Sequence, residues 1–279
     1  MSMSIFVTKA DGTKQLFDRK KVLNTCIRMG ASRGIADEIA NKVETKVYDG
    51  IETKKILQII FKLLGEYKPA TKHIIDLRES LSLMKPKPDF ESFIQLLLRE
   101  HGYEVTPNQI VKGRCVKHEV DAIARKNSET YIVEVKHHLN FHARTVLDES
   151  RITWAILEDA NEGFELGFSD LKIDKAMIVT NTKFSEDAKS YGECKGINQI
   201  GWSFPPNKGL QTLIEEKKLY PITYLKGLKN ADRERLTSSG IILLWQLIEM
   251  SPEKLGKTGI SMKTIASTIE NAKSILSKE

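Results

Sequence analysis

The sequence predicts a multidomain protein of mixed α/β (α+β) class, and three observations support that prediction. A chain of 279 residues is long enough for two or three domains. Alternating lysine and proline at 84–89, and a weaker proline break at 218–223, interrupt helical patterns as linkers do. Between these breaks the chain combines short strand-like runs with helical periodicity. We therefore divide the chain into domains 1–85, 86–220 and 221–279.

The composition is typical of a globular protein with a polyanionic partner. Hydrophobic residues make up 41% of the chain and charged residues 29%, and no apolar run approaches the ~20 residues that span a bilayer, so we expect no membrane association. Cys26, Cys115 and Cys194 show neither a zinc-binding spacing nor a disulfide framework, which favours a reducing, cytoplasmic location. The net charge of +6 favours nucleic acid as a partner.

The N-terminal segment predicts a mostly helical domain with a β-hairpin. Ile5 and Val7 alternate with polar residues before an Asp-Gly turn, and Leu16 and Phe17 follow that turn. Asp18 is the expected N-cap of the next helix. Helical periodicity extends over four segments: 19–30, 34–50, 53–67 and 71–83.

Three motifs in this segment resemble the ATP-cone, a nucleotide-sensing domain found at the N-terminus of many ribonucleotide reductases. They are VTKADGTKQLFDRKKV, VYDGIETKKI and IIDLRESL, in the family's order and spacing. The resemblance implies that ATP or dATP binds, with Lys9 and Lys21 on the phosphates and Thr53 in a second nucleotide-facing stretch. Two alternatives stay open: the lysines are solvated surface residues, or the domain serves only in oligomerisation.

The middle segment predicts a helix followed by an antiparallel hairpin. Asp89 is the expected N-cap of the helix. Two strand-like runs, 118–124 and 130–136, are separated by a polar segment that predicts a turn at Asn127 and Ser128. The apolar residues of the helix fall on one stripe: Phe93, Ile94, Leu97 and Leu98.

A turn at that position brings two carboxylates together. Asp121 then lies opposite Glu134, with Cβ atoms about 4.5–5.5 Å apart, and Lys136 shares the face of Glu134. One Mg²⁺ ion can bind both carboxylates and remove their repulsion, whereas a register slip of one residue turns Asp121 to the other face. The alternative is an ordinary solvated Glu-x-Lys ion pair, a pattern that arises easily by chance.

The order of helix, strand, VDAIA and YIVEVK resembles the PD-(D/E)xK nuclease superfamily, and its Mrr-type restriction endonuclease branch most closely, over residues 88–220. The resemblance implies a central restriction-endonuclease-like mixed sheet flanked by helices. It also implies that Asp121 and Glu134 bind Mg²⁺ or Mn²⁺, that Lys136 completes the catalytic triad, and that Glu91 is the acidic residue of the first helix. Phosphodiester hydrolysis needs such a metal and a nearby cation.

One feature departs from that branch. Many Mrr-like proteins carry a Gln after the Glu-x-Lys strand, and none stands at that place here. Four other side chains follow the strand, and any of them could contact a phosphate or face solvent in a loop: His137, His138, His142 and Arg144.

The C-terminal segment predicts a small all-α domain that resembles a helix-hairpin-helix pair. Its apolar stripes are separated by two short turns, TSSGI and KTGIS. In that family such turns present backbone N–H groups to DNA phosphates, which implies DNA contacts from Lys257, Gly259, Ser261 and Lys263. The alternative is that the turns only join helices or mediate protein contacts.

These patterns combine into one functional hypothesis. We expect a Mg²⁺- or Mn²⁺-dependent DNA endonuclease, a hydrolase acting on ester bonds, whose activity or assembly responds to ATP or dATP. DNA is preferred to RNA because two segments resemble DNA-binding modules, and the resemblances also imply a homodimer. The alternative is a non-catalytic, nucleotide-responsive DNA-binding regulator on a nuclease-like scaffold. The absent Gln favours that alternative, and the set of Asp121, Glu134 and Lys136 opposes it.

Overall fold

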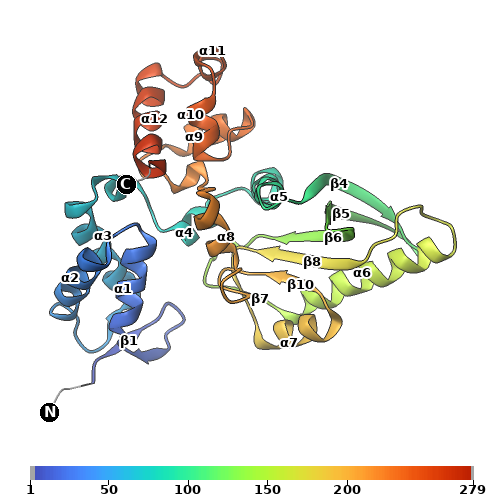
Figure 1. The fold of residues 1–279 in the computed structure, drawn as a ribbon, viewed down its shortest axis with the longest axis horizontal. Coiled ribbons are helices and arrows are strands. Elements are labelled where there is room, and N and C mark those ends of the chain that lie inside the picture. The colour runs from blue at the N-terminus through green and yellow to red at the C-terminus, as the bar shows by residue number, and fades with distance from the viewer. Residues whose placement is uncertain (1–3, 278–279) are drawn as a thin grey trace. The chain divides into compact units, whose positions relative to one another are not determined.

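A computed structural model describes residues 4–277, which fold as two compact units (Figure 1). The first unit contains the described residues through Ile74, together with Leu225–Gly227 and those from Lys263 onward. The second unit contains Ile75–Tyr224 and Leu228–Met262. No helix among the described residues is long and apolar enough to cross a membrane.

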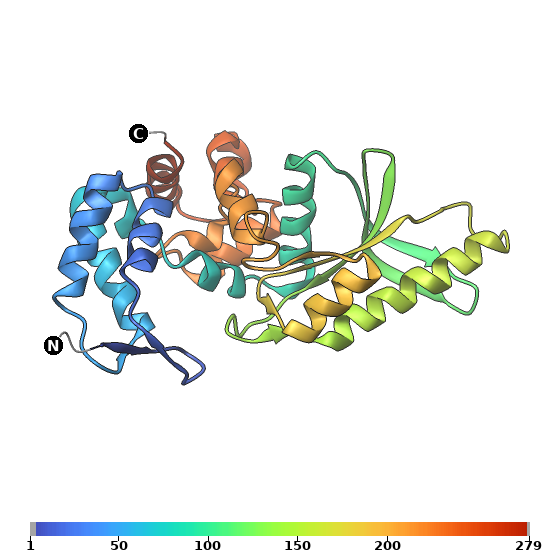
Figure 2. The ribbon, with the colours of Figure 1, turned by 60° about the horizontal axis from the view of Figure 1, so that its bottom comes forward.

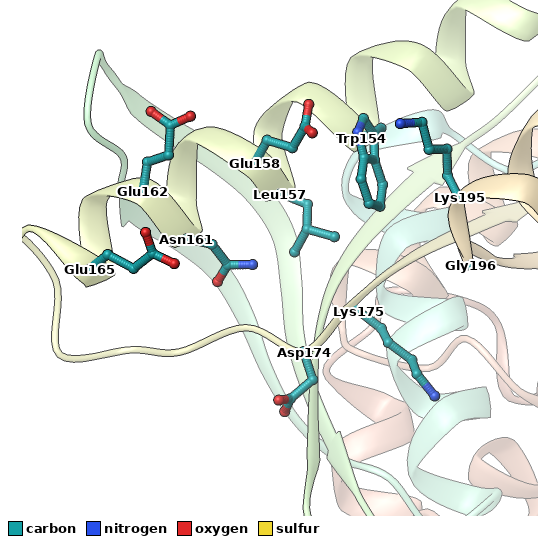
Figure 3. A pocket seen from close by; sticks show the side chains of 10 residues that line it. All are labelled: Trp154, Leu157, Glu158, Asn161, Glu162, Glu165, Asp174, Lys175, Lys195 and Gly196. Atoms are coloured by element: carbon teal, nitrogen blue, oxygen red, sulfur yellow. The ribbon is translucent and has the colours of Figure 1, made fainter.

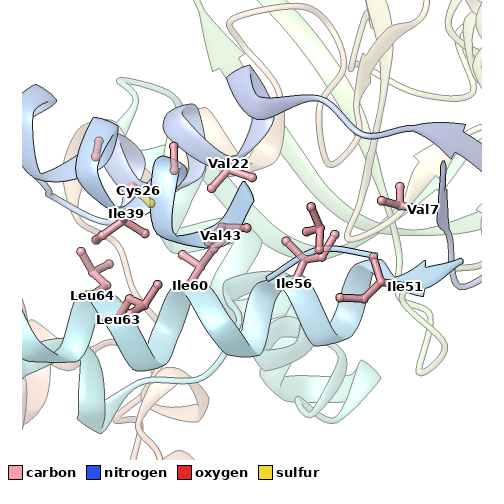
Figure 4. Close-up of a cluster of buried hydrophobic side chains, with 13 residues drawn as sticks. Val7, Val22, Cys26, Ile39, Val43, Ile51, Ile56, Ile60, Leu63 and Leu64 are labelled. Carbon is pink, nitrogen blue, oxygen red and sulfur yellow. The ribbon is translucent and has the colours of Figure 1, made fainter. Parts of the chain in front are cut away.

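The first unit packs a small sheet against three helices. In the sheet, β1 lies between β2, its antiparallel hairpin partner, and β3, its parallel partner. Figure 4 shows the shared core, with Val22 and Cys26 of α1, Ile39 of α2, and Ile60 and Leu64 of α3. The elements are β1 (Phe6–Thr8), β2 (Lys14–Leu16), α1 (Arg19–Arg28), α2 (Arg33–Glu44), β3 (Ile51–Glu52), α3 (Thr53–Tyr67) and the 3₁₀ helix η1 (Pro69–His73).

The first three predicted helices of this unit form, and the second is shorter than expected. The Asp18 carboxylate accepts a hydrogen bond of 2.9 Å from the Lys20 amide and so caps α1, as predicted. The helix expected over 34–50 ends at Glu44, because the chain must turn into the strand β3 soon afterwards.

The fourth predicted helix, over 71–83, is wrong as a continuous element. It forms as η1 and a separate helix α4 (Leu77–Ser82), which belongs to the second unit. The break occurs because the Asp76 carboxylate accepts a hydrogen bond of 3.0 Å from the Glu79 amide and starts a new helix there. The preceding Ile74 is extended.

The second unit is built on a mixed sheet, as predicted, and its five strands have the order β10-β8-β6-β5-β4. Strands β4, β5 and β6 are antiparallel, whereas β6, β8 and β10 are parallel and are joined by α6 and α7. Figures 1 and 2 show α6 and α7 along one face of the sheet and α5 on the other side. The bounds are α5 (Glu91–Glu100), β4 (Glu104–Lys112), β5 (Lys117–Lys126), β6 (Glu129–Lys136), β7 (Arg144–Thr145), α6 (Leu147–Glu165), β8 (Lys175–Thr180), β9 (Lys183–Phe184), α7 (Glu186–Lys195), β10 (Asn198–Ile200), α8 (Leu210–Lys217) and η3 (Ile222–Tyr224).

Alternation along β6 decides which residues face α6. Ile132 packs with Leu157 of α6 in one buried cluster, and the next residue, Val133, is buried on the opposite face. Because side chains alternate between the faces of a strand, Glu134 and Lys136 lie on the face that α6 covers.

The segment predicted as a linker, 84–89, is packed into the second unit. It leads through the turn η2 (Pro86–Phe90) directly into α5, and both Asp89 and Phe90 are buried. The prediction of Asp89 as N-cap is wrong, because α5 begins at Glu91 and Phe90 occupies the capping position without a side-chain cap.

The C-terminal segment is all-α, as predicted. The break at 218–223 is a packed connection in which the Ile222 amide donates a hydrogen bond of 2.8 Å to the Ile242 carbonyl. Both predicted glycine turns form, and Gly240 and Gly259 have φ of 79° and 70°, a left-handed backbone that glycine adopts without strain. The helices are α9 (Asn230–Ser238), α10 (Leu244–Glu249), α11 (Pro252–Gly256) and α12 (Met262–Leu276).

Candidate active site

The hairpin of β5 and β6 forms in the predicted register, with its turn at 127–128. The last paired residues of the ladder are Ala122 and Val133. Asp121 and Glu134 are the next residues of the two strands, and they lie close enough for the charge of Asp121 to raise the pKa of Glu134. The structure therefore brings the two predicted metal ligands together.

Asp121 is held rigidly where the ladder opens. Its Oδ2 atom accepts a hydrogen bond of 2.7 Å from the Val135 amide, so the side chain replaces the next backbone bond to β6. Its carbonyl oxygen accepts a bond of 3.2 Å from the Gln95 side-chain amide of α5. Only 9% of Asp121 is exposed. A carboxylate fixed from both sides keeps its geometry when a ligand arrives.

Glu134 is a buried carboxylate with an unfilled hydrogen-bonding position. It is 8% exposed, and its Oε1 atom has no hydrogen-bond partner. Burial, followed by the negative charge of Asp121, raises the pKa of Glu134 to about 7. A buried carboxylate oxygen without a partner is unfavourable, and a cation at that place removes both the repulsion and the missing bond.

The donor set fits Mg²⁺ or Mn²⁺ through two carboxylates. Within residues 4–277 no group of three or more His, Cys, Asp or Glu side chains is arranged to hold a metal ion. Mg²⁺ commonly binds through only one or two carboxylates and keeps several waters. Asp121 and Glu134, with the partnerless Oε1, supply that number of protein ligands.

Lys87 provides a cation beside these carboxylates and was missed in the sequence. Its Nζ atom lies 3.1 Å from Glu91 Oε1, 3.3 Å from Asp121 Oδ1 and 3.9 Å from Glu119 Oε1. The hydrogen bond to Glu91 raises the pKa of Lys87 despite partial burial, and the charge of Asp121 adds to that effect. Burial and the charge of Asp121 raise the pKa of Glu91. Glu91 and Asp121 therefore share Lys87 as a common ion-pair partner.

Lys136, the last predicted member of the set, is paired with a residue that the sequence did not reveal. Its Nζ atom lies 3.1 Å from Glu149 Oε2, at the start of α6, and 3.7 Å from Glu134 Oε2. Burial lowers the pKa of Lys136, but the bond to Glu149 and the charge of Glu134 outweigh burial and raise it. Lys136 is therefore a permanent cation beside the carboxylate pair.

The residues that follow Lys136 have two different roles. His137 and His138 are partly buried, and their Nε2 atoms lie 2.9 Å from the Leu81 carbonyl and 3.1 Å from Thr145 Oγ1. Burial lowers the pKa of both imidazoles, so they are neutral and hold the loop in place. Of the four side chains predicted after the strand, the other two, His142 and Arg144, are exposed.

The predicted nucleotide-binding residues lie in the first unit. The parallel pairing of β1 with β3 ends at Thr8 and Glu52, and Lys9 and Thr53 are the residues that follow this last pair. Lys21 lies in the first turn of α1. A pocket of about 370 Å³ in this unit is formed at the far ends of α1 and α3, and its lining is Gly30, Ala31, Ser32, Ile35, Leu64, Tyr67 and Lys68.

The predicted DNA-binding residues of the C-terminal segment are not gathered in one unit. Lys257, Gly259 and Ser261 belong to the second unit, and Lys263, in the first turn of α12, belongs to the first. The Gly259 carbonyl accepts a hydrogen bond of 2.8 Å from Arg235. Lys257 forms an exposed ion pair with Glu253 on α11, a bond of little energetic weight.

A pocket of about 470 Å³ lies at the other end of β8 from the carboxylates (Figure 3). Trp154 and Glu158 of α6 line it together with Lys175, the first residue of β8. Lys136 pairs instead with Thr180, the last residue of β8, about 16 Å further along the strand. The pocket is therefore separate from the candidate site, and Trp154 packs against the core.

Comparison with known proteins places the chain in a family. A family model described as restriction endonuclease matches residues 81–200, and a model described as AF1548-like, C-terminal, matches 220–276. An uncharacterized protein of Archaeoglobus fulgidus is 38% identical over 180 residues, which are 64% of this chain and 98% of that protein. The crystal structure of a protein of unknown function, AF1548, aligns with a TM-score of 0.56 and 36% identity over 66% of this chain and 96% of that one.

The chain therefore belongs to the AF1548-like family. It carries a restriction endonuclease-like domain followed by an AF1548-like C-terminal domain. The prediction of a restriction-endonuclease-like α/β domain is confirmed, whereas the ATP-cone and the helix-hairpin-helix assignments stay predictions.

Proposed function

We propose that this protein is a metal-dependent endonuclease that hydrolyses phosphodiester bonds in DNA. The observation that carries the proposal is the pair of buried, mutually repelling carboxylates, Asp121 and Glu134, which lie beside Lys136 just beyond the last pair of the ladder. A restriction endonuclease-like domain surrounds them. A fold selected for stability alone has no reason to set two carboxylates opposite each other.

Asp121 and Glu134 would hold Mg²⁺ or Mn²⁺. When bound, such an ion activates water and neutralises charge on the phosphoryl oxygens. The chain's own contribution is orientation: the Val135 amide and the Gln95 amide fix Asp121 before any ligand is present. Glu91 assists by holding Lys87 close to the Asp121 carboxylate.

Lys136 acts through its charge. Because the contact with Glu149 keeps it protonated, Lys136 cannot take a proton from water at neutral pH. Its ammonium group instead orients the attacking water and stabilises the negative charge that develops on the phosphate. Glu149 is a positioning residue, since it reaches the reaction only through Lys136.

The first unit would bind ATP or dATP and regulate activity or assembly of a homodimer. Support comes from the pairing of β1 with β3, because Lys9 and Thr53 follow its last pair and their ammonium and hydroxyl groups are suited to contact a phosphate. Titration calorimetry with ATP and with dATP tests this part. We expect Lys9→Ala and Lys21→Ala to weaken binding, and unchanged affinity in both variants would refute the assignment.

A second candidate function is a non-catalytic DNA-binding regulator. It is favoured by one observation: Lys87 lies within ion-pair distance of both Asp121 and Glu91, so the chain supplies a cation of its own to these carboxylates. A site that has lost turnover can be stabilised by such an internal cation.

Supercoiled plasmid distinguishes the two candidates. We expect the full chain to nick or linearise the plasmid in Mg²⁺, to lose that activity in EDTA, and to lose it in Asp121→Ala. Metal-independent cutting, or cutting that survives Asp121→Ala, would contradict the assignment of the site. DNA binding without any cutting would establish the regulator instead.

A further inference from the structure

Arg78, on α4, is a partly buried cation that forms no ion pair with any acid of residues 4–277. Its guanidinium carbon lies 5.8 Å from the ring centroid of Phe141 and 5.9 Å from that of Trp202. Its Nε atom is buried and has no hydrogen-bond partner, and no ion pair joins Arg78 to any acid of the described chain. The nearby Asp76 carboxylate is engaged in capping α4. The buried Nε–H of Arg78 lacks the acceptor that a buried donor normally has, so the guanidinium group is available to an external anion.

A second arginine, Arg144, lies close enough to act on Arg78 through its charge. Burial lowers the pKa of Arg78, and the positive charge of Arg144 lowers it further. Arg144 is itself exposed and lies opposite Lys183 in the parallel pair of β7 and β9. The acid near Arg144 is Glu186, which is bonded to Lys189 at 2.9 Å. The positive charges of Arg78 and Arg144 repel each other, and an anion bound by both would relieve that repulsion.

The cluster lies at the same end of the sheet as the candidate active site. His137, the residue after Lys136, bonds to the Leu81 carbonyl, and Leu81 lies one helical turn after Arg78 on α4. Figure 1 shows α4 close to the end of the sheet at which β6 terminates. Phe141, which contacts Arg78, is in the loop that leaves β6.

That loop is anchored at both of its ends. The Asn181 side chain bonds both the amide and the carbonyl of His138, at 2.9 and 2.8 Å. At the far end, the Thr145 hydroxyl bonds those of Thr180 and Thr182 at 2.9 and 3.0 Å, and all three residues are fully buried. Phe141 and Arg144 are therefore held in fixed positions relative to Lys136.

We propose that Arg78 and Arg144 form a phosphate-binding subsite that holds the DNA backbone beside the bond to be cut. This inference rests on the proposed function and specifies how the substrate is positioned. Phe141 and Trp202 are already engaged with the guanidinium group, at the distance of a cation–π contact. The N–H donors of Arg78 remain for a ligand, and a guanidinium fork matches two phosphate oxygens.

A phosphate contact of this kind positions the substrate without selecting sequence. Arg78 should therefore contribute equally to the binding of different DNA sequences. Its loss should also reduce the salt dependence of binding, because each neutralised phosphate releases counterions.

Fluorescence anisotropy with a fluorescein-labelled DNA duplex, in EDTA, tests the subsite. We expect Arg78→Ala in the full chain to weaken binding about 10-fold and to lower the slope of log K against log salt by about 1. Arg78→Lys should retain the slope and recover only part of the affinity, because it keeps the charge and loses the fork. The matched control is Arg151→Ala, an exposed arginine of α6 paired with Asp148, which should bind as the wild type does.

Three results would overturn the subsite: unchanged affinity and slope in Arg78→Ala, an equal loss in Arg151→Ala, or tighter Arg78-dependent binding to an RNA duplex than to DNA. Thermal unfolding shows whether the Arg78→Ala variant is folded. If that variant is unfolded, the binding measurements with Arg78→Lys test the subsite instead. Failure of the proposed function looks different. In that case the wild type binds DNA with the Arg78 dependence described and never cuts plasmid.

Discussion

Strand β6 carries a glutamate near each end, and the two have opposite surroundings. Glu129 is partly exposed, lies 2.6 Å from Lys175 and accepts a bond from the Tyr131 hydroxyl, and these bonds lower its pKa. Glu134 is buried, its Oε1 atom has no partner, and its pKa is raised to about 7. The hydrogen-bonding positions of Glu129 are filled by residues of the protein, whereas Glu134 keeps one oxygen that a ligand can occupy. Burial and missing partners, more than residue type, thus locate a site.

The largest expected effect is the difference in cleavage rate between variants of the two glutamates. We expect Glu134→Gln to lower the initial rate of plasmid cleavage at least about 1,000-fold, because loss of a metal ligand removes several kcal/mol of transition-state stabilisation. Glu129→Gln should stay within about two-fold of the wild type, since an exposed ion pair contributes little. Equal losses in the two variants would mean that the ends of β6 do not differ in function.

The lysine partners of the two glutamates, Lys136 and Lys175, should differ in the same way. Lys136→Met should lower the cleavage rate about 100-fold, the usual loss when one electrostatic group is removed from an active site. Lys175→Met, which removes the partner of Glu129, should leave it unchanged. A wild-type rate in Lys136→Met would show that its charge plays no part in the reaction.

The raised pKa of Glu134 predicts a pH-dependent stability in metal-free protein. Between its ordinary pKa of 4.5 and about 7, the folded protein keeps a proton on Glu134 that the unfolded chain releases. Raising the pH through this window therefore favours unfolding, by at most about 3 kcal/mol at 1.4 kcal/mol per pH unit.

Thermal unfolding in EDTA at pH 5 and pH 8 measures this effect. Glu134→Gln should lose less stability than the wild type over that interval, because its amide does not titrate. Identical pH dependence in both proteins would show that Glu134 is ionised throughout, contrary to its buried surroundings.

The smallest effect concerns Lys87, which competes with a metal for Asp121 and Glu91. Lys87→Met should tighten Mn²⁺ binding about 10-fold in titration calorimetry, since removal of a positive charge near a cation site strengthens the site's attraction. Lys85→Met is a matched control, because Lys85 is paired with Glu234. Weaker Mn²⁺ binding in Lys87→Met would mean that Lys87 supports the metal site.

The hairpin was predictable because the residues that determine it are close together in the sequence. A polar turn between two strand-like runs determines which residues pair, and the turn at 127–128 was enough to set Asp121 against Glu134. The helices α1 and α3 were predictable for the same reason, from apolar spacing and from the Asp18 cap.

The partners of the site were not predictable, because they come from distant segments. Lys87 lies 34 residues before Asp121, in a lysine- and proline-rich stretch that has the composition of a linker. Glu149 and Arg78 reach the end of β6 only through the packing of α6 and α4. Asp89 was assigned as a cap from its residue type, yet it is buried one residue before the true capping position.

Binding of Mn²⁺ in the absence of DNA tests the central claim most directly. Titration calorimetry of the wild type, Glu129→Gln and Glu134→Gln compares the two ends of β6 without relying on cleavage. We predict that the wild type and Glu129→Gln bind Mn²⁺ equally and that Glu134→Gln binds it at least about 10-fold more weakly. Equal binding by all three proteins would contradict the assignment of Asp121 and Glu134 as a metal site.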